Sequence, residues 1–467
     1  MSVTSSASDS LSPGLKSRHI RMLSIAGVIG AGLFVGSGHA IAEAGPAVLI
    51  AYIIAGGLVV LIMRMLAEMA VSTPDSGSFS TYAQKALGRW AGFTIGWLYW
   101  WFWVLVIPLE ANAAATILNS WFPQVAIWQF TLVITLLLTA SNLFSVKHYG
   151  EFEFWLALVK VVAIVAFLVL GCVAIFGLMP GSQVSGMSHL YDTGGFMPHG
   201  FGAVLAAILT TMFSFMGTEI VTIAAAESKN PGREISRATN SVIWRISLFY
   251  LLSILFIVSL VPWNTPALAK NGSYQTVLEL MNIPHARLIV DIVVLTAVCS
   301  CLNSALYTSS RMLYSLATRK DAPAAAAKTN KGGTPWVAVL SSTAAAFLAV
   351  FANYFAPAEV FDFLLASSGA IALLVYLVIS CSHLVMRKRM EARGEALDYR
   401  MWLFPGLTYA VIVVIVGILC SMLFMPAHRS EIIATGILAL LVVLAGLVIH
   451  RRQRNNRSHS SLQENGI

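Results

Sequence analysis

The sequence Gly27-Val28-Ile29-Gly30-Ala31-Gly32-Leu33-Phe34-Val35-Gly36 lies within the first hydrophobic run of the chain. Each glycine lowers helix propensity by roughly 1 kcal/mol relative to alanine. Close packing of membrane helices favours small residues and accounts for some of these glycines. It accounts for all of them together less well than a local loss of helical structure does. We therefore predict that the backbone is unwound around Val28–Gly32.

A second interruption, Phe213-Ser214-Phe215-Met216-Gly217-Thr218-Glu219, falls in the middle of the sixth hydrophobic run. Glu219 shares this apolar segment with Gly217, and a charged side chain at such depth costs at least about 2.5 kcal/mol on insertion scales. Glu219 is therefore a candidate functional residue, with a buried structural hydrogen bond as the alternative. Backbone breaks at membrane depth are tolerated where they line a cavity.

The two breaks are five helices apart, which places them in corresponding positions of two inverted repeats of five helices. A pair of interrupted helices of this kind is typical of the substrate site of a secondary transporter. A half-helix N-terminus with free amides at Ala31–Leu33 would bind a carboxylate. Free carbonyl groups near Val28 and Phe213 would bind an ammonium group, so the expected substrate is a zwitterion.

The composition places these breaks in an all-α integral membrane protein. Of the 467 residues, 58% are hydrophobic and only 11% are charged, whereas soluble domains are about a quarter charged. A spanning helix needs roughly 20 apolar residues, and the hydrophobic runs predict twelve such helices in a single membrane domain. The expected ranges are 20–41, 46–70, 93–118, 127–146, 153–177, 202–225, 240–262, 286–315, 335–353, 358–383, 402–425 and 431–450.

The distribution of lysine and arginine sets the expected orientation. With a cytoplasmic N-terminus, 24 of the 29 cations fall on the cytoplasmic side, 3 fall outside, and Arg64 and Lys160 lie within spans. Cytoplasmic loops carry an excess of these residues. We therefore expect cytoplasmic tails at 1–19 and 451–467 around a membrane domain at 20–450. The net charge of +8 then reflects membrane orientation and not nucleic-acid binding, and no signal-peptide cleavage pattern is visible.

Several charged residues lie within the expected spans. Lys160 is about two turns into the fifth span, where burial disfavours its charged form, so it is a candidate proton carrier; snorkelling to the cytoplasmic interface is the alternative. Glu110 is in the middle of the third span, and its partner cannot be read from the sequence. Glu68 and Arg64 are one helical turn apart and are expected to pair with each other as a structural contact.

Two further regions receive structural interpretations. The aromatic cluster Trp97–Trp103 is expected to serve helix packing and the membrane interface, with substrate contact as the alternative. The basic, alanine-rich segment Arg311–Lys331 is expected to be a solvated cytoplasmic loop, with a role in gating as the alternative. The five cysteines show neither disulfide nor zinc spacing, and we expect no metal and no cofactor.

A set of short motifs carries a resemblance to a known family. The motifs are Leu15–His19, Gly27–Gly36, Ala44–Pro46, Arg64–Ala70, Gly77–Tyr82, Gly150–Trp155, Phe213–Glu219, Glu227–Pro231 and Leu302–Met312. Each is weak alone, but together they are highly specific. From about Leu15 to Arg452 the chain resembles the amino-acid permeases of the amino acid–polyamine–organocation (APC) superfamily. Within that superfamily it resembles the bacterial 4-aminobutyrate (GABA) permeases most closely.

The resemblance implies a fold and an activity. The fold is the five-plus-five inverted-repeat (LeuT-like) core of the sodium-coupled neurotransmitter transporters, with helices 1 and 6 broken and two additional C-terminal helices. The activity is import of an amino acid across the bacterial inner membrane by proton symport and alternating access. The expected partners are a small zwitterionic amino acid, a proton and the lipid bilayer.

The resemblance also assigns roles to single residues. Gly30, Ala31 and Gly32 align with carboxylate-binding amides, and Val28 and Phe213 align with carbonyl groups that receive the amine. Phe213 further aligns with an aromatic gate, Glu219 with the acid of the sixth helix, and Lys160 with a lysine whose ammonium replaces a sodium ion. The expected substrate-binding set is Val28, Ile29, Gly30, Ala31, Gly32, Phe213, Ser214, Phe215 and Gly217, and the expected proton-coupling residues are Lys160 and Glu219.

One departure and several alternatives remain. Many relatives carry Ser or Thr where this chain has Ala31, so the substrate carboxylate would be held by backbone amides alone. GABA as the substrate rests on overall similarity, including the segment 97–110, and a permease for proline or an aromatic amino acid is the alternative. A channel or a transporter-like sensor is a more remote reading. An enzyme is not expected, because the sequence has no His-Glu-x-x-His and no obvious nucleophile–base pair.

Overall fold

The computed structural model describes residues 27–464, except 76, 144–145, 227–229, 356 and 427–428, together with Arg18 and Met22. Within this part of the chain the only regular secondary structure is helical. The expected N-terminal tail, apart from Arg18, and the last three residues of the expected C-terminal tail lie outside the described residues.

The first half of the described chain contains helices up to 33 residues long. They are η1 (Gly32–Gly36), α2 (Ser37–Ala44), η2 (Gly45–Ala47), α3 (Val48–Ser72), α4 (Ser78–Leu87), α5 (Arg89–Trp121), α6 (Ile127–Asn142) and α7 (Val146–Ile175). Here η marks a short 3₁₀ or π-helical segment.

The second half begins with a loop and continues with further long helices. They are η3 (Ser188–Leu190), α8 (Gly200–Phe215), α9 (Ile220–Ala226), α10 (Pro231–Arg245), η4 (Ile246–Leu251), α11 (Leu252–Leu260), α12 (Pro266–Asn271), α13 (Ser273–Leu280), α14 (Ala286–Thr318), η5 (Ala324–Ala327), α15 (Trp336–Phe355), α16 (Pro357–Ala392), α17 (Gly406–Leu423) and α18 (Arg429–Glu464).

The described helices are those of a multi-pass membrane protein. Nine of them are long and apolar enough to cross a bilayer, and two shorter apolar helices, Ile127–Asn142 and Trp336–Phe347, accompany them. The longest of the nine, Gly32–Ser72, contains the turn η2 and overlaps two of the expected spans. Each expected span overlaps one or more observed helices, the first only over its described residues from Ala31 onward.

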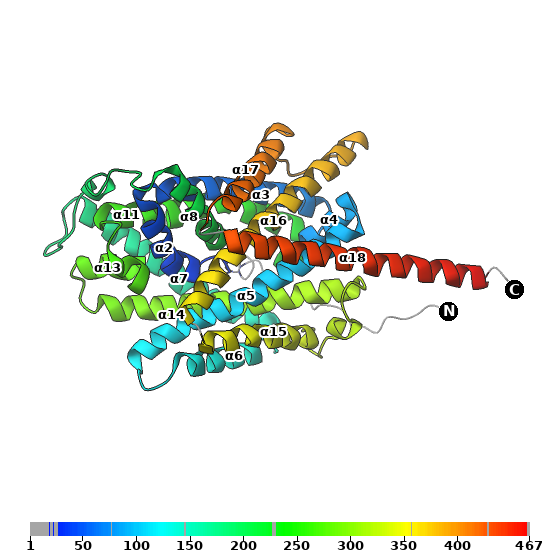
Figure 1. Cartoon of the computed structure of the whole chain (residues 1–467), viewed down its shortest axis with the longest axis horizontal. Coiled ribbons are helices and arrows are strands. Elements are labelled where there is room, and N and C mark those ends of the chain that lie inside the picture. The colour runs from blue at the N-terminus through cyan, green and yellow to red at the C-terminus, as the bar shows by residue number, and fades with distance from the viewer. Residues whose placement is uncertain are drawn as a thin grey trace.

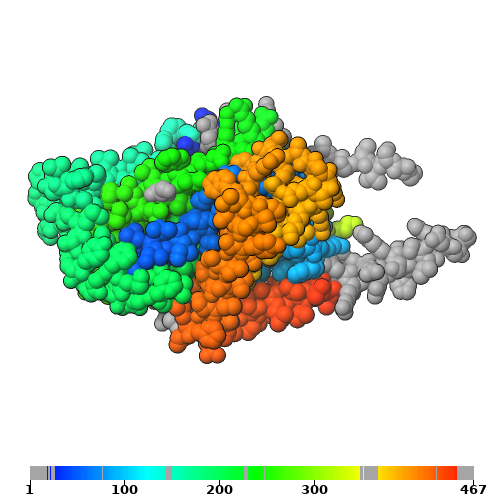
Figure 2. All heavy atoms as spheres, turned by 90° about the horizontal axis from the view of Figure 1, so that it is seen from above, coloured from blue at the N-terminus to red at the C-terminus, as the bar shows by residue number. Residues whose placement is uncertain are grey.

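The long helices run side by side along the long axis of the molecule, as Figure 1 shows for α5, α14, α15 and α18. Helix α5 packs against α14, α4, α6 and α16, so it lies at the centre of the bundle. The segment Gly200–Ala225 is 94% buried over its most apolar stretch, whereas the corresponding stretch of α18 is only 11% buried. Helices α16–α18, orange to red, cover one face of the molecule in Figure 2.

The expected break in the sixth run is confirmed, and the expected unwinding around Val28–Gly32 is confirmed for Val28–Gly30, whereas Ala31 and Gly32 are helical. Residues Gly27–Gly30 are not helical, and the following turn, η1, is π-helical instead of α-helical. Helix α8 ends at Phe215, and α9 begins again at Ile220. Gly217 in this second break has φ +106°, a backbone conformation that residues other than glycine rarely adopt.

The expectation of a solvated loop over Arg311–Lys331 is wrong for its first part, whereas Lys320, Lys328 and Lys331 in the following segment are exposed. Helix α14 continues to Thr318, and the Arg311 side chain is buried, with its guanidinium 4.1 Å from the centroid of the Tyr307 ring. Further along, Ala326 packs against Trp97 and Trp100 of α5. Basic composition misled the prediction because long cationic side chains can bury their stems against aromatic surfaces.

Candidate functional site

The two helix breaks are packed directly against each other in the centre of the bundle. A Cβ atom on Gly217 would collide with the carbonyl oxygen of Gly27, and one on Gly32 would lie 2.9 Å from the Cα atom of Ser214. Only glycine at these positions allows such an approach of the two backbones. The sequence analysis predicted both breaks, and the structure brings them together.

The amides expected to bind a carboxylate are already occupied. The N–H of Ala31 donates to both carboxylate oxygens of Glu110, at 3.1 Å to Oε1 and 3.0 Å to Oε2. The N–H of Leu33 donates to the carbonyl of Gly30 at 3.2 Å. The expectation of free amides is therefore wrong for Ala31 and Leu33 in this state of the protein, because a buried amide must find an acceptor and two lie within reach.

The carbonyl groups expected to bind an ammonium group are also occupied. The hydroxyl of Tyr250 donates to the carbonyl of Val28 at 3.2 Å, across 222 residues of sequence. The N–H of Met216 donates to the carbonyl of Phe213 at 3.2 Å. The expectation of free carbonyls is corrected in the same way as that of free amides.

Little empty space remains between the two breaks. A cavity of about 10 Å³ is lined by Gly27, Val28, Gly32, Phe102, Trp103, Val106, Glu110, Phe213, Met216 and Cys301. That volume holds about one water molecule. The structure is therefore a closed state in which protein groups fill the candidate site.

Sequence reasoning missed several residues that line this cavity or contact its backbone. Phe102 and Trp103 belong to the aromatic cluster that was assigned mainly to packing, so substrate contact, the alternative reading, gains support for these two. Cys301 lies with its sulfur 3.6 Å from the carbonyl of Gly27. Tyr250 carried no signal in the sequence, since nothing in its apolar surroundings distinguishes it from other membrane tyrosines.

Glu219 is fully buried and links the second break to helix α5. Its carboxylate accepts hydrogen bonds from the hydroxyl of Tyr99 at 2.8 Å and from the N–H of Gly217 at 3.1 Å. Thr218 lies farther away, with its hydroxyl at 3.5 Å. Glu219 does not line the small cavity between the breaks. These contacts hold the turn in a fixed shape, and a proton role for Glu219 remains a prediction.

Lys160 of α7 is fully buried and lies near other ionisable side chains. Glu153 and Glu110 are near enough for their charges to act on it. Glu153 itself accepts hydrogen bonds from the Asn303 amide, at 2.7 Å, and from the hydroxyl of Ser300, both on α14. Snorkelling of Lys160 to the interface does not occur in this state, because its side chain has no exposed surface.

Glu68 and Arg64 do not pair with each other as expected. Glu68 of α3 accepts hydrogen bonds from Arg387 at 2.8 Å and from the N–H of Met401 at 2.6 Å, and His383 lies 3.2 Å away. Arg64 stacks on Trp402, with its guanidinium 3.9 Å from the ring centroid. Contacts from α16 and the loop after it therefore replace the pairing within one helix.

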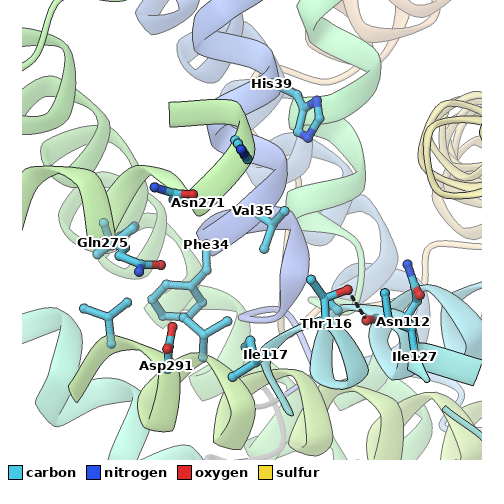
Figure 3. Close-up of a pocket in the computed structure, with 16 residues that line it drawn as sticks. Phe34, Val35, His39, Asn112, Thr116, Ile117, Ile127, Asn271, Gln275 and Asp291 are labelled. Atoms are coloured by element: carbon cyan, nitrogen blue, oxygen red, sulfur yellow. Dashed lines mark hydrogen bonds between the residues drawn. The ribbon is translucent and has the colours of Figure 1, made fainter. Parts of the chain in front are cut away.

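A larger cavity with both polar and apolar lining residues lies beside Phe34, three residues beyond Ala31. It has a volume of about 380 Å³ and is bounded by α2, α5, α13 and α14. Figure 3 shows Gln275 and Asp291 on the side of the Phe34 ring, with Asn112 and Thr116 of α5 opposite. The ring of Phe34 also packs on Tyr274, with centroids 4.8 Å apart. Phe34 and Tyr274 thus form part of the wall between this cavity and the core.

Metal binding finds no support in the described residues. No group of three or more His, Cys, Asp or Glu side chains is placed there to hold an ion.

Comparisons with known proteins identify relatives of the whole chain. The model of the amino acid permease family matches residues 19–461. A gamma-aminobutyric acid permease of Escherichia coli is 68% identical over 439 residues, 94% of each chain. A probable GABA permease of Pseudomonas aeruginosa is 66% identical over 445 residues, which cover 95% of this chain and 94% of the relative.

The fold is also similar to that of a solved structure. A crystal structure of a variant of the Eremococcus coleocola manganese transporter matches with a TM-score of 0.56 over 92% of both chains. Only 14% of the aligned residues are identical. This likeness concerns the arrangement of the helices and says nothing about the substrate.

Proposed function

This chain belongs to the amino acid permease family, and we propose that it imports 4-aminobutyrate (GABA) into the bacterial cell by proton symport. The observation that carries the proposal is the identity of 66–68% to GABA permeases over nearly the whole chain. The match covers 95% of this chain and therefore spans both helix breaks.

The proposed architecture completes the observed helices. Twelve spans form a five-plus-five inverted-repeat core, with α17 and α18 as the two additional C-terminal helices. The excess of Lys and Arg in alternate loops supports cytoplasmic termini in the inner membrane. The tails at 1–19 and 451–467 then flank one transporter domain at 20–450.

The proposed substrate site lies between the two breaks. Gly30, Ala31 and Gly32 would supply amides for the carboxylate, and the carbonyl groups of Val28 and Phe213 would receive the ammonium group. Packing of Gly217 against Gly27 supports this arrangement because it sets the two breaks side by side. The remaining members of the proposed site are Ile29, Ser214, Phe215 and Gly217.

The proposed site must open before a substrate can enter. Its cavity of about 10 Å³ is far too small for a molecule of seven non-hydrogen atoms. Alternating access supplies that opening through movement of the half-helices at the breaks. The cavity beside Phe34 is the proposed route of approach, since its volume of about 380 Å³ accommodates a hydrated zwitterion.

Proton coupling is assigned to Lys160 and Glu219. Burial of Lys160 between Glu153 and Glu110 supports this role, because a change in its charge would alter the energy of both carboxylates. Glu219 is supported by its full burial and by its direct bond to the Gly217 amide at the second break.

Uptake by purified protein in liposomes tests the proposed function. With the interior alkaline and sodium absent, labelled GABA should accumulate, saturate with concentration, and be competed by unlabelled GABA better than by proline or phenylalanine. Collapse of the pH gradient by a protonophore should abolish accumulation. Absence of GABA-competable uptake would reject the substrate, and accumulation that ignores the pH gradient would reject proton symport. Non-saturable flux would indicate a channel.

A further inference from the structure

Protein side chains occupy both ends of the proposed zwitterion site in the closed state. The Glu110 carboxylate accepts from the Ala31 amide at 3.0–3.1 Å, where the substrate carboxylate is expected. The Tyr250 hydroxyl donates to the Val28 carbonyl at 3.2 Å, where the substrate ammonium is expected. An acceptor thus stands at the carboxylate end and a donor at the ammonium end.

We propose that Glu110 and Tyr250 are resident substitutes for the two ends of the substrate, and that substrate binds by exchanging with them. This inference rests on the proposed function, and it adds a competitor at each end of the site. The exchange keeps a partner on the Ala31 amide and on the Val28 carbonyl whether or not substrate is bound. A closed site without such substitutes would bury an unsatisfied amide and an unsatisfied carbonyl, each at a cost in free energy.

The surroundings of Glu110 are shaped for this position. Its side chain comes from the middle of α5, and both it and Ala31 are buried. A Cβ atom on Gly30 would lie 2.5 Å from Oε1 of Glu110 and 2.8 Å from the sulfur of Cys301. Absence of a side chain at Gly30 is therefore what lets the carboxylate reach the Ala31 amide.

The exchange adds a proton-binding step at Glu110, made when substrate binds, to the coupling roles proposed for Lys160 and Glu219. In the closed state the site holds the negative charge of Glu110. When the substrate carboxylate takes over the Ala31 N–H, the displaced Glu110 carboxylate loses the hydrogen bonds that stabilised its charge in this buried region. A proton from the aqueous phase then forms an O–H bond with one oxygen of Glu110, while the two N–H···O contacts to that carboxylate break. At the other end, the hydrogen bond from Tyr250 to the Val28 carbonyl breaks as the substrate ammonium takes its place. Because the zwitterion itself is neutral, the site gains the single positive charge of the proton.

Other titratable groups face Glu110 from the neighbouring helices. They are Lys160 from α7 and the thiols of Cys301 and Cys299 from α14, with Glu153 of α7 beyond Lys160. Lys160 cannot take the role of Glu110, because a protonated lysine side chain has no acceptor for the Ala31 N–H. The direct contact with the substrate-binding amide belongs to Glu110.

Equilibrium binding of labelled GABA to the purified full-length protein between pH 5 and pH 9 tests the exchange. For the wild type, the dissociation constant should rise about tenfold per pH unit once Glu110 is ionised, as linkage to one proton requires. Glu110→Gln should bind GABA with a constant that is independent of pH over this range. Glu153→Gln is the matched control, a buried carboxylate that does not contact Ala31, and it should keep the wild-type slope.

Tyr250→Phe tests the other end of the site. Removal of the hydroxyl leaves the Val28 carbonyl without its resident donor, so GABA should bind roughly threefold to tenfold more tightly, as expected for loss of one competing hydrogen bond. A purely structural tyrosine would weaken binding or leave it unchanged when truncated, and either result would overturn its part of the proposal.

Several outcomes would overturn the role of Glu110. One is a dissociation constant of Glu110→Gln that depends on pH as steeply as that of the wild type. Another is loss of GABA binding by a monodisperse Glu110→Gln protein, since that result would make Glu110 a ligand of the substrate ammonium. If that variant does not fold, proton uptake by the wild type is measured instead, with a pH indicator in weak buffer as GABA is added. Absence of proton uptake would overturn the exchange. Failure of the wild type to bind any GABA would instead reject the proposed function.

Discussion

Glu68 and Glu110 are both about 1% exposed, yet the protein holds their carboxylates in different ways. Glu68 is bonded to the guanidinium of Arg387 and to the Met401 amide, with His383 at 3.2 Å. Glu110 is bonded to the backbone amide of Ala31. The first carboxylate is tied to a cation on a neighbouring helix, and the second caps a broken helix.

The different surroundings of the two carboxylates indicate which of them can exchange its hydrogen-bond partner. Removal of one member of a buried ion pair leaves an uncompensated charge, which is strongly destabilising. A carboxylate on a backbone amide can be replaced there by any other carboxylate, because the amide has no preference for the molecule that carries it. We therefore assign Glu68 to stability and Glu110 to the transport cycle, and four substitutions test that division.

The largest effect is expected for Arg387→Ala, which leaves Glu68 buried without its cation. We expect a loss of roughly 3–5 kcal/mol of stability, measured as a large fall in the thermal unfolding midpoint in detergent. Arg393→Ala is the control, because its ion pair with Glu395 at 3.5 Å is exposed on both sides and contributes at most about 1 kcal/mol. Equal midpoints for both variants would remove the contrast between the two acids.

Gly217→Ala is expected to damage the breaks themselves. The φ of +106° and the approach of the Gly27 carbonyl leave no room for a methyl group, and strain of this kind costs about 1–3 kcal/mol. GABA uptake should fall at least about tenfold, which equals 1.4 kcal/mol. Gly57→Ala is the matched control, since nothing lies within 4 Å of the added Cβ atom, and normal uptake is expected for it.

Glu219→Gln should lose transport but insert normally into the membrane. Like Glu110, Glu219 contacts a backbone amide at a break, and the neutral amide side chain replaces charge-assisted hydrogen bonds with weaker ones. We expect uptake to fall about tenfold with little change in the thermal midpoint. Unchanged uptake would return Glu219 to a structural hydrogen-bonding role and place it beside Glu68.

Lys160→Ala is expected to have the smallest effect on substrate passage itself. Accumulation of GABA driven by a pH gradient should be abolished, because the buried charge that interacts with Glu153 and Glu110 is gone. Exchange of internal for external GABA should persist in part, since Lys160 does not line the cavity between the breaks. Retained accumulation in the presence of a gradient would refute a coupling role for Lys160.

The sequence predicted the positions of the helices well because the lipid bilayer constrains them. Hydrocarbon thickness sets the length of each apolar run, so a local count of residues is sufficient. The breaks were readable for a similar reason, since Gly27 to Gly36 and Gly217 are local departures from helix-forming composition. The pairing of Glu68 with Arg64 failed because spacing on one helix says nothing about α16, which supplies Arg387 instead.

The sequence alone thus determined a membrane protein with two interrupted helices and a resemblance to a permease family. The tertiary structure decided what occupies the interruptions. Ala31 and Glu110 are 79 residues apart, and Val28 and Tyr250 are 222 residues apart. Such contacts depend on how each helix is rotated and packed against its neighbours, which hydrophobicity along the chain does not encode. The requirements of the bilayer act on consecutive residues and so determine which segments are helices. The packing of these helices determines which groups their buried polar side chains contact.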